Sequence, residues 1–547
     1  MNQNGAISVL AVAGMVLAGC GGSSSSDSAG DVATPFMEQC EALAGLPVEG
    51  GGVTTAIHTP ANDGDPSSAL WPDHCLVRGA MNQRTGIDDK PYALRFEVRL
   101  PAEWNDRLYY QGGSGVDGTL FTAVGQYAGG GNTRNALIDG FAVVTTDSGH
   151  QTEAGVPNGA FLFGADPQAR DEYGDMQIPQ VTAAARTVIE RLYGSPDQYA
   201  YFVGCSNGGR QAMIAAQRYP DLFNGIIASA PGFRLAQASI QALYQAQLTA
   251  EVAPTGQGRA PDLSQGLTTE EKTVVRDRIL DSCDSLDGLE DGMINRVSAC
   301  QLDPTEWVCA VGESDNCLSQ EKAEYVAAMF AGAYTTDNEL IYAPWPFDPG
   351  MVSQFGNPFL GIFAGEASHI YTTPPTITED LTGYALNADI DQEYQKLRAT
   401  NGTFQRSGID FTNGESPNLD AFRANGGKLI MLNGSADLAF SPLDMAAYYD
   451  EVEDRYGPAI EDFLRAYVIP GMGHCSGGQA TDQFDSFQAL RQWAEQGNRP
   501  EAITATAGDG TPWPGRTRPL CPYPSEAVYD GVGNPESAQS FRCELPD

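Results

Sequence analysis

The stretch Gly204-Cys205-Ser206-Asn207-Gly208 decides the fold of this chain. It follows the run 199–203, Tyr-Ala-Tyr-Phe-Val, whose β-branched and aromatic residues predict a buried strand. It precedes the run 209–218, Gly-Arg-Gln-Ala-Met-Ile-Ala-Ala-Gln-Arg, which is rich in helix formers. Glycines two residues to either side of Ser206 allow a sharp backbone turn and close packing of the helix on the strand. The sequence therefore predicts a strand, a tight turn that exposes the serine hydroxyl, and a helix.

A serine on such a strand–turn–helix is the nucleophile elbow of the α/β-hydrolase fold. The N-terminus of the following helix favours negative charge that develops beside the serine. The alternative is a chance G-x-S-x-G match, because the chain contains 62 glycines. The predicted strand and helix on either side favour the elbow over chance.

The sequence around the elbow alternates apolar runs with helical patterns, which is typical of a mainly parallel sheet covered on both faces. Before about residue 234 we expect strands at 92–100, 107–110, 141–145, 199–203 and 225–229, and a helix at 181–192. After residue 425 we expect strands at 428–432 and 463–469 and a helix at 482–496. The rhythm is lost between these parts, where the chain is irregular and rich in Gly, Pro, Asp and Tyr. We expect an α/β-hydrolase fold with a large inserted lid domain: a catalytic domain of residues 36–234 and 425–547, and a lid of residues 235–424.

The N-terminus predicts export. Residues 6–17 form an apolar run too short to span a bilayer, and the box Leu17-Ala18-Gly19-Cys20 resembles a lipoprotein cleavage site, although the first residues carry no Lys or Arg. We expect a signal peptide at 1–20, a flexible linker at 21–35, and an exported protein, either an outer-membrane lipoprotein anchored at Cys20 or a periplasmic or extracellular one. The net charge of −39 argues against binding to nucleic acid or to an anionic membrane surface, so any membrane contact should come only through a lipid at Cys20.

Eleven cysteines are present, and assigning Cys20 to a lipid leaves ten. Sequence alone does not fix their pairing, but an exported chain favours disulfides over free buried thiols. Short spacings suggest the pairs Cys40–Cys75, Cys283–Cys300, Cys309–Cys317 and Cys521–Cys543. Cys205 and Cys475 are left over, far apart in sequence but each beside a candidate catalytic residue.

A serine nucleophile needs a base, and the base needs an orienting carboxylate. In this fold the chain order is serine, acid, histidine, with the last two on loops after later strands. His474 is the histidine that follows a late core strand in a glycine-rich loop, whereas His369 lies in the insertion. Asp437 is the first acid after the strand that starts at Lys428, although an Asx-turn is an alternative role for it. The oxyanion hole should combine the amide of Asn207 with one from the loop 112–115.

The motifs Gly-Cys-Ser-x-Gly-Gly and Gly-x-x-His-Cys-Ser-Gly-Gly, with Asp437 between them, resemble the tannase and feruloyl esterase family. The resemblance covers nearly all of the mature chain, including 73–75, 84–88 and the tail 516–524. It implies a disulfide between Cys205 and Cys475. It also implies oxyanion amides at Gly115 and Asn207, and the pocket residues Ser114, Phe440 and Asn433.

The acidic loop 283–293 carries Asp284, Asp287 and Asp291 within eight residues. Such close carboxylates repel one another unless a hard cation lies among them, and their spacing is not that of an EF-hand. Similar family members bind calcium here, which implies Leu289 and Met293 as carbonyl ligands. The alternative is a solvated acidic turn. We expect structural Ca²⁺ in the lid and no organic cofactor.

Two departures concern the substrate. A family member that cleaves a terephthalate monoester holds the free carboxylate with a lid arginine, yet no Lys or Arg occurs between Lys322 and Lys396, which includes the aligned segment 356–363. Asn433 replaces a pocket histidine, and His369 is the remaining candidate cation. We expect a serine esterase that acts on small esters of aromatic acids. The resemblance implies that it acts like the family member that cleaves a terephthalate monoester. The alternatives are a feruloyl or galloyl esterase that acts on plant phenolic esters, and a non-catalytic calcium-dependent surface binding lipoprotein.

Overall fold

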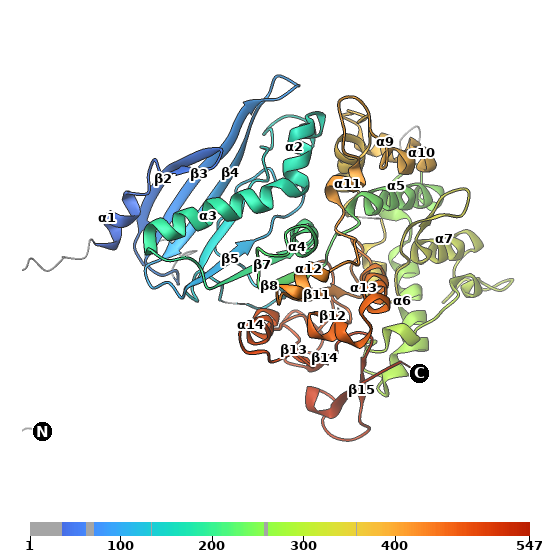
Figure 1. Cartoon of the computed structure of the whole chain (residues 1–547). Helices are drawn as coiled ribbons and strands as arrows, with labels where there is room; N and C mark the ends of the chain where they lie inside the picture. The colour runs from blue at the N-terminus through green and yellow to red at the C-terminus, as the bar shows by residue number, and fades with distance from the viewer. Residues whose placement is uncertain (1–34, 62–69, 133, 256–260, 357, 547) are drawn as a thin grey trace, which may run out of the picture.

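A computed structural model describes residues 35–61, 70–132, 134–255, 261–356 and 358–546 (Figure 1). The predicted signal peptide, Cys20 and nearly all of the predicted linker lie outside the described residues. None of the helices in these ranges has both the length and the apolar character needed to cross a bilayer.

A ten-stranded sheet forms the centre of the catalytic part, in the order β1-β2-β3-β4-β6-β5-β7-β8-β11-β12. Its strands are β1 (Pro47–Val48), β2 (Gly51–Thr59), β3 (His74–Thr85), β4 (Pro91–Pro101), β5 (Arg107–Gln111), β6 (Ala142–Thr146), β7 (Tyr199–Cys205), β8 (Gly225–Ser229), β11 (Lys428–Gly434) and β12 (Leu464–Ile469). All seven strands expected from the sequence are present, with ends shifted by at most two residues. The expected helices are α3 (Gln177–Tyr193), α4 (Asn207–Arg218) and α14 (Ser486–Gln496).

Six of the ten strands, from β6 to β12 in the sheet order, pair in parallel as expected, whereas the four strands at the other end do not. Strands β1 to β4 pair antiparallel, and β4 also pairs antiparallel with β6. Antiparallel strands can be joined by a short connection, as β3 and β4 are through residues 86–90, whereas parallel strands need a longer crossover. The elbow strand β7 lies in the parallel half between β5 and β8.

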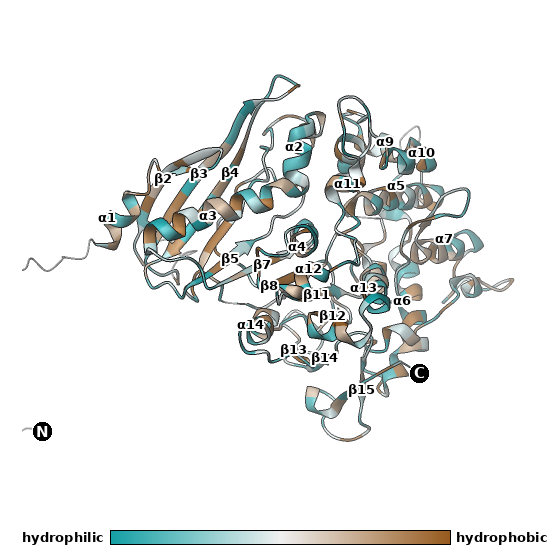
Figure 2. Ribbon diagram, viewed as in Figure 1, coloured by the Kyte–Doolittle hydropathy of each residue, from teal (hydrophilic) through white to brown (hydrophobic). Residues whose placement is uncertain are grey.

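Two apolar clusters cover the faces of the sheet. Buried side chains of α3, α4 and α13 (Pro442–Tyr456) pack on one face, and those of α14 pack on the other. Brown stretches lie along several strands of the sheet in Figure 2, and β6, β8 and β11 are buried nearly throughout, as expected for strands covered on both faces. This packing fixes the end of β7, and therefore the elbow, within a rigid layer.

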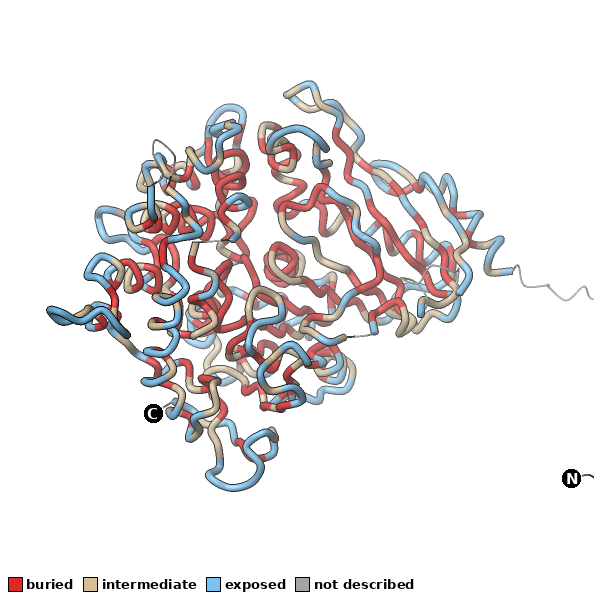
Figure 3. The backbone as a smooth tube through the Cα atoms, turned by 180° about the vertical axis from the view of Figure 1, so that it is seen from behind, coloured by how far each residue is buried: buried red, intermediate tan, exposed pale blue. Residues whose placement is uncertain are grey.

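The inserted segment is largely helical, contrary to the irregular structure expected from the sequence. Its helices are α5 (Leu235–Val252), α6 (Thr269–Cys283), α7 (Gln320–Ala331), α8 (Leu360–Glu366), α9 (Leu381–Asn387), α10 (Ile390–Lys396), α11 (Gly408–Thr412) and α12 (Asp420–Ala424), with a small hairpin of β9 (Ala333–Tyr334) and β10 (Leu340–Tyr342). Helix α5 is buried on most sides, and Figure 3 shows the buried segments in red. A helix buried in this way is apolar around most of its circumference, so its sequence does not show the single apolar stripe of a surface helix. The remaining elements are α1 (Phe36–Glu41), α2 (Pro167–Asp171), and the tail strands β13 (Ile503–Thr506), β14 (Thr517–Leu520), β15 (Glu526–Tyr529) and β16 (Phe541–Glu544).

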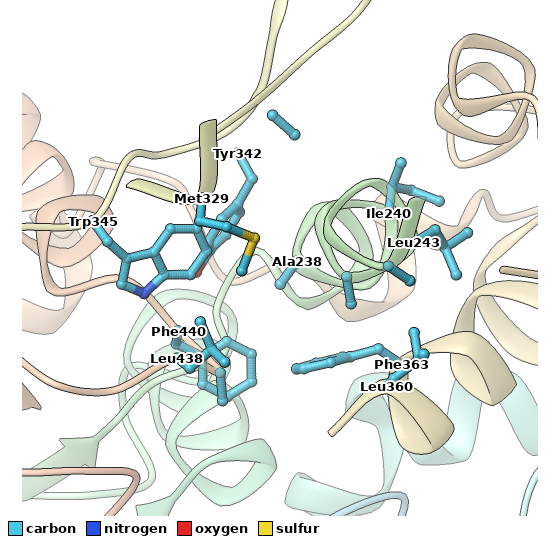
Figure 4. Close-up of a cluster of buried hydrophobic side chains, with 14 of the residues drawn as sticks. Ala238, Ile240, Leu243, Met329, Tyr342, Trp345, Leu360, Phe363, Leu438 and Phe440 are labelled. Atoms are coloured by element: carbon cyan, nitrogen blue, oxygen red, sulfur yellow. The ribbon is translucent and has the colours of Figure 1, made fainter. Parts of the chain in front are cut away.

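The apolar core of the insertion continues into the loop after β11. Leu438 and Phe440 belong to the same cluster as residues of α5, α7 and α8. Figure 4 shows these two side chains between Trp345 and Phe363, which both come from the insertion. The Trp345 indole Nε1–H also donates to the backbone carbonyl of Asp437 (2.7 Å). The insertion therefore supports the loop that carries Asp437.

Five disulfides join the ten cysteines of the described residues, in the four pairs that short spacings suggest and the fifth pair that the family resemblance implies. They are Cys40–Cys75, Cys205–Cys475, Cys283–Cys300, Cys309–Cys317 and Cys521–Cys543.

Candidate active site

Ser206 lies at the turn between β7 and α4 with φ 63° and ψ −123°, a conformation that non-glycine residues rarely adopt. The two glycines of the motif make this turn possible. A Cβ on Gly204 would lie 2.4 Å from the carbonyl carbon of Gly208, and a Cβ on Gly208 would lie 2.6 Å from the oxygen of Gly113. Only glycine fits at either position, because real Cβ atoms do not approach backbone so closely. The turn places Ser206 beyond the carboxyl end of the strand, as the sequence predicts.

Ser206, His474 and Asp437 form a hydrogen-bonded chain. The His474 Nε2 lies 2.9 Å from the Ser206 Oγ, and the His474 Nδ1 lies 3.0 Å and 3.2 Å from the two carboxylate oxygens of Asp437. The Asp437 carboxylate is fully buried and also accepts from the amides of Ala439 (2.8 Å) and Phe440 (3.3 Å). Asp437 lies on the loop after β11 and His474 lies on the loop after β12. Because β11 and β12 are neighbouring parallel strands, both loops lie at the same edge of the sheet.

The environment of His474 suits a base. Burial alone would lower the pKa of His474, but the charge of Asp437 and the hydrogen bond to it outweigh burial and raise that pKa above 6.5. The imidazole side chain keeps 18% of its surface exposed, so it faces the site and not the core.

The Cys205–Cys475 disulfide joins the residue before Ser206 to the residue after His474. Its Cα atoms are 6.0 Å apart across a sequence separation of 270 residues. The bond therefore ties the loop of the serine directly to the loop of the histidine.

Gly115 and Asn207 lie on the two loops expected to form the oxyanion hole, and both border the same cavity as Ser206. The buried Asp117 connects these loops. Its Oδ1 accepts from the Ser114 amide (3.0 Å), and its Oδ2 accepts from the Asn207 side-chain amide (2.9 Å) and from Gln211 (2.8 Å). One carboxylate thus fixes the position of the loop before Gly115 relative to the first turn of α4.

A cavity of about 150 Å³ lies against Ser206 and His474. Its apolar walls come from Leu235, Phe359, Ile362, Phe363, Ala439 and Phe440, and its other polar lining comes from Ser114, Asn207 and Glu366, with Gly115. The rings of Phe359 and Phe440 pack edge-on against the His474 imidazole at 5.2 Å and 5.6 Å between centroids. Cavities of about 150 Å³ accept one benzene-sized molecule. The site therefore combines a half-buried serine that borders the cavity with space for a single aromatic ring.

The structure places two of the predicted pocket residues, Ser114 and Phe440, on the cavity wall. Asn433 is buried and lies behind it: its side chain donates to the carbonyl of Phe440 (3.0 Å) and accepts from the Gly434 amide (2.9 Å). His369 is fully buried with its Nδ1 2.7 Å from Ser368 Oγ, and burial lowers its pKa below 6.5. His369 does not line the cavity and its burial disfavours the charged form, so it does not supply a cation to the site.

The acidic loop lies between α6 and the tail strands. In the described part of the chain, no three Asp, Glu, His or Cys side chains gather at metal-ligating distance. The carboxylate of Asp284 accepts from the amide of Gly292 (3.0 Å), Asp287 accepts from the Leu289 amide (3.0 Å), and Asp291 pairs with Arg518. The oxygen-rich donor set suits a hard cation, but these carboxylates are engaged by the loop itself and by an arginine.

Sequence reasoning missed Asp117, Trp345 and Glu366. A signal existed for two of them. Asp117 follows the glycine loop within two residues of Gly115, and Glu366 continues the 3–4 spacing of Phe359, Ile362 and Phe363 along one helix face. Trp345 contacts a residue 92 positions away, which no local pattern reports.

This geometry defines a class: an α/β-hydrolase with a serine–histidine–aspartate site, which is the architecture of a serine esterase. The family model described as "Tannase and feruloyl esterase" matches residues 75–544, so the chain belongs to the tannase and feruloyl esterase family and is a carboxylic ester hydrolase. This membership confirms the resemblance found in the sequence and argues against a non-catalytic binding lipoprotein.

Among curated proteins, the chain is 36% identical to the mono(2-hydroxyethyl) terephthalate hydrolase of Piscinibacter sakaiensis, over 90% of this chain and 88% of that protein. It is 28% identical to a probable feruloyl esterase of Arthroderma benhamiae, over 88% of each chain. Feruloyl esterase B from Aspergillus oryzae shares the fold with a TM-score of 0.75 at 22% identity, covering 93% of this chain and 100% of that one. These similarities confirm the fold class.

Proposed function

We propose that this esterase hydrolyses small esters of aromatic carboxylic acids, with Ser206 as the nucleophile. The observation that carries the proposal is the hydrogen-bonded chain from Ser206 through His474 to Asp437, set against an aromatic-lined cavity that holds one ring. The names of its relatives, a terephthalate monoester hydrolase and feruloyl esterases, agree with this substrate class.

In the proposed reaction Ser206 Oγ attacks the ester carbonyl while His474 Nε2 takes the hydroxyl proton. Asp437 holds the imidazole in orientation and stabilises it once it is protonated. The amides of Gly115 and Asn207 donate to the oxyanion. His474 then gives the proton to the leaving alcohol. In the second half, a water molecule activated by His474 attacks the acyl-enzyme, releases the acid and restores Ser206.

The charge of the acyl group divides the candidate substrates. No Lys or Arg is found among the described residues that line the cavity, so a ring carboxylate would lose its hydration without gaining a cation. A missing arginine clamp removes roughly 1.5–3 kcal/mol of charge-assisted hydrogen bonding. We therefore propose that uncharged aromatic esters are hydrolysed at least as well as mono(2-hydroxyethyl) terephthalate, which favours phenolic esters of the feruloyl or galloyl type as the second candidate class.

The test combines a serine probe with a substrate panel. A fluorophosphonate probe should label Ser206 of the native protein, and S206A should fold, resist labelling and lose activity by several orders of magnitude. The panel compares kcat/KM for mono(2-hydroxyethyl) terephthalate with that for an uncharged aromatic ester of similar size, at low and high salt. Substantial activity in S206A would refute the nucleophile, and a strong preference for the charged monoester at both salt levels would refute the substrate assignment.

Export is part of the proposal. The apolar N-terminal run with the box at 17–20 and the five disulfides agree with an oxidising compartment outside the cytoplasm. Mass spectrometry of the mature N-terminus tests this. A diacylglyceryl group on Cys20 would establish the lipid anchor, and an intact Met1 would contradict export.

We further propose that the acidic loop binds Ca²⁺ through Asp284, Asp287 and Asp291, with the carbonyls of Leu289 and Met293. Support comes from the donor chemistry and from the burial of Asp287, which together with the charge of Asp291 raises the Asp287 pKa to about 6. Thermal unfolding with CaCl₂ and with a chelator tests binding directly. An equal unfolding midpoint in both, or an equal calcium effect in D287A, would contradict the site.

A further inference from the structure

The inserted segment reaches both loops of the triad through one buried carboxyl group, that of Asp348. This residue follows β10 in the insertion, and it is 2% exposed. Its Oδ2 accepts hydrogen bonds from the Ser435 hydroxyl group and from the Gly471 amide (3.1 Å). Its Oδ1 accepts from the amide of Gly350 in its own loop (2.8 Å). A single oxygen of Asp348 therefore bonds to the loop after β11 and to the loop after β12.

Both partners lie close to a catalytic residue in the sequence. Ser435 precedes Asp437 by two residues, and Gly471 precedes His474 by three. The hydrogen bonds of Asp348 therefore act on the two segments whose relative position sets the contact between the Asp437 carboxylate and the His474 imidazole.

The two loops also contact each other at this point. The Gly471 amide lies 2.7 Å from the Ser435 Oγ, and the Ala436 amide donates to the carbonyl of Met472 (3.0 Å). A Cβ on Gly434 would lie 2.0 Å from the Met472 oxygen, so only glycine fits there. Because the loops are packed this closely, a displacement of one loop is transmitted to the other.

A carboxyl group is a costly choice for this position if the contact serves stability alone. Its burial must be offset by hydrogen bonds, and apolar side chains of similar volume often stabilise a buried position at least as well. A carboxyl group adds directional hydrogen bonds to two loops at once. Burial raises the pKa of Asp348, but its partners are all donors and therefore bond best to the ionised form. Such precision matters for the reaction, since a misplacement of reacting groups by about 1 Å can cost about 100-fold in rate.

We infer that Asp348 is a positioning residue for the reaction, which holds the loops of Asp437 and His474 in the arrangement that orients the imidazole. Asp348 is not among the residues that line the cavity beside Ser206, so it acts through Ser435 and Gly471. This inference rests on the proposed function, and it gives the inserted segment a part in catalysis besides covering the pocket.

The experiment measures kcat and KM for p-nitrophenyl acetate across the pH range, together with urea unfolding of the same preparations. Asp348→Ala should lower kcat by about 10–100-fold and change KM by less than about threefold. The acidic limb of kcat/KM should move to lower pH, because a loosened contact with Asp437 raises the pKa of His474 less. Asp348→Asn should keep more of kcat than Asp348→Ala, because its amide oxygen still accepts a hydrogen bond.

Ser435→Ala removes the hydroxyl donor and leaves Asp348 in place. It should lower kcat and move the acidic limb in the same direction. The double variant Asp348→Ala/Ser435→Ala should lose less than the product of the two single losses, because both changes remove the same contact. A double loss equal to that product would show that the two residues act independently and would contradict the inference.

The matched control is Glu393→Gln. Glu393 is a buried glutamate of the insertion, and it accepts from the Tyr384 hydroxyl group (2.8 Å) and from Lys396 Nζ (2.7 Å). This control should lose stability while kcat and the acidic limb stay at their wild-type values. It separates the loss of a buried carboxyl group in the insertion from a change in the triad.

A folded Asp348→Ala enzyme with wild-type kcat and an unshifted acidic limb would overturn the inference, whatever its stability. An equal fall of kcat in Glu393→Gln would overturn it as well. If Asp348→Ala does not fold, Asp348→Asn and Ser435→Ala decide, and wild-type kcat and pH profiles in both would overturn it. The proposed function fails separately, if the wild-type enzyme cleaves p-nitrophenyl acetate but no ester of an aromatic acid. The comparison of variants on p-nitrophenyl acetate remains valid in that case.

Discussion

Replacing Asp117 by Asn should damage catalysis more than substrate binding. The carboxylate accepts four hydrogen bonds: from the Ser114 amide at Oδ1, and from Ser148 (2.8 Å), Asn207 and Gln211 at Oδ2. An asparagine keeps one acceptor oxygen and puts an NH₂ group in place of the other. If its oxygen stays with the three side-chain donors, the NH₂ group faces the Ser114 amide, and two donors then oppose each other.

The expected losses of stability and of kcat follow from the hydrogen bond between the Ser114 amide and Asp117, which anchors the loop before Gly115. Loss of one hydrogen bond to a charged acceptor costs about 1.5–3 kcal/mol of stability, and the loop before Gly115 loses its anchor. Removal of a whole oxyanion donor costs about 100–1000-fold in kcat, so a displaced donor should cost about 10–100-fold. KM should change by less than about threefold, because the oxyanion contact forms fully only in the transition state.

The assay is steady-state kinetics on one aromatic ester, together with urea unfolding of the same preparations. Asp444→Asn is the control, since Asp444 is also a buried carboxylate but pairs with Arg234 (2.7 Å) and does not contact the oxyanion loops. It should lose stability without a comparable loss of kcat. A folded Asp117→Asn enzyme with wild-type kcat would refute the reasoning, as would an equal fall of kcat in both variants.

Three further predictions concern the triad loops. Replacing Cys205 and Cys475 together by serine should lower the free energy of unfolding by about 5 kcal/mol, because the bond closes a loop of 270 residues, and an unchanged urea midpoint would contradict this. The acidic limb of kcat/KM should have its midpoint above pH 6.5, because activity needs neutral His474 and the folded protein raises that pKa, so activity is lost as the pH falls through it. In Asp437→Asn the residual activity should show this limb at lower pH, since the raising charge is gone, and an unshifted limb would argue that another group titrates. Trp345→Phe should lower the free energy of unfolding by about 1–3 kcal/mol and lower kcat, because the buried carbonyl of Asp437 loses its hydrogen-bond donor. Wild-type values of both quantities would show that this hydrogen bond contributes neither to stability nor to catalysis.

The parts of the molecule that local patterns encode could be predicted from the sequence. The elbow, the strands beside it and the order of serine, acid and histidine follow from short apolar runs and fixed neighbours, so the amino-acid sequence alone is enough to name Ser206, Asp437 and His474. Helix α5 of the inserted segment could not be predicted in this way, because it is buried on most sides and carries no polar stripe. The family resemblance predicts that Asn433 lines the pocket. In the structure Asn433 lies behind the cavity wall, and its side chain donates a hydrogen bond to the carbonyl of Phe440.

The apolar core that the insertion shares with the acid loop has a consequence for attempts to rebuild this enzyme. Leu438, Ala439 and Phe440 are packed inside that core, and Trp345 bonds to the residue before them. Exchanging the insertion for that of a relative would therefore replace the surroundings of Asp437 as well as the substrate pocket, and every graft would test two changes at once. Single substitutions on the cavity wall avoid this coupling, because they leave the junction intact. Laboratory evolution of new specificities in this scaffold should accordingly accumulate point changes along α8 and not recombine whole insertions.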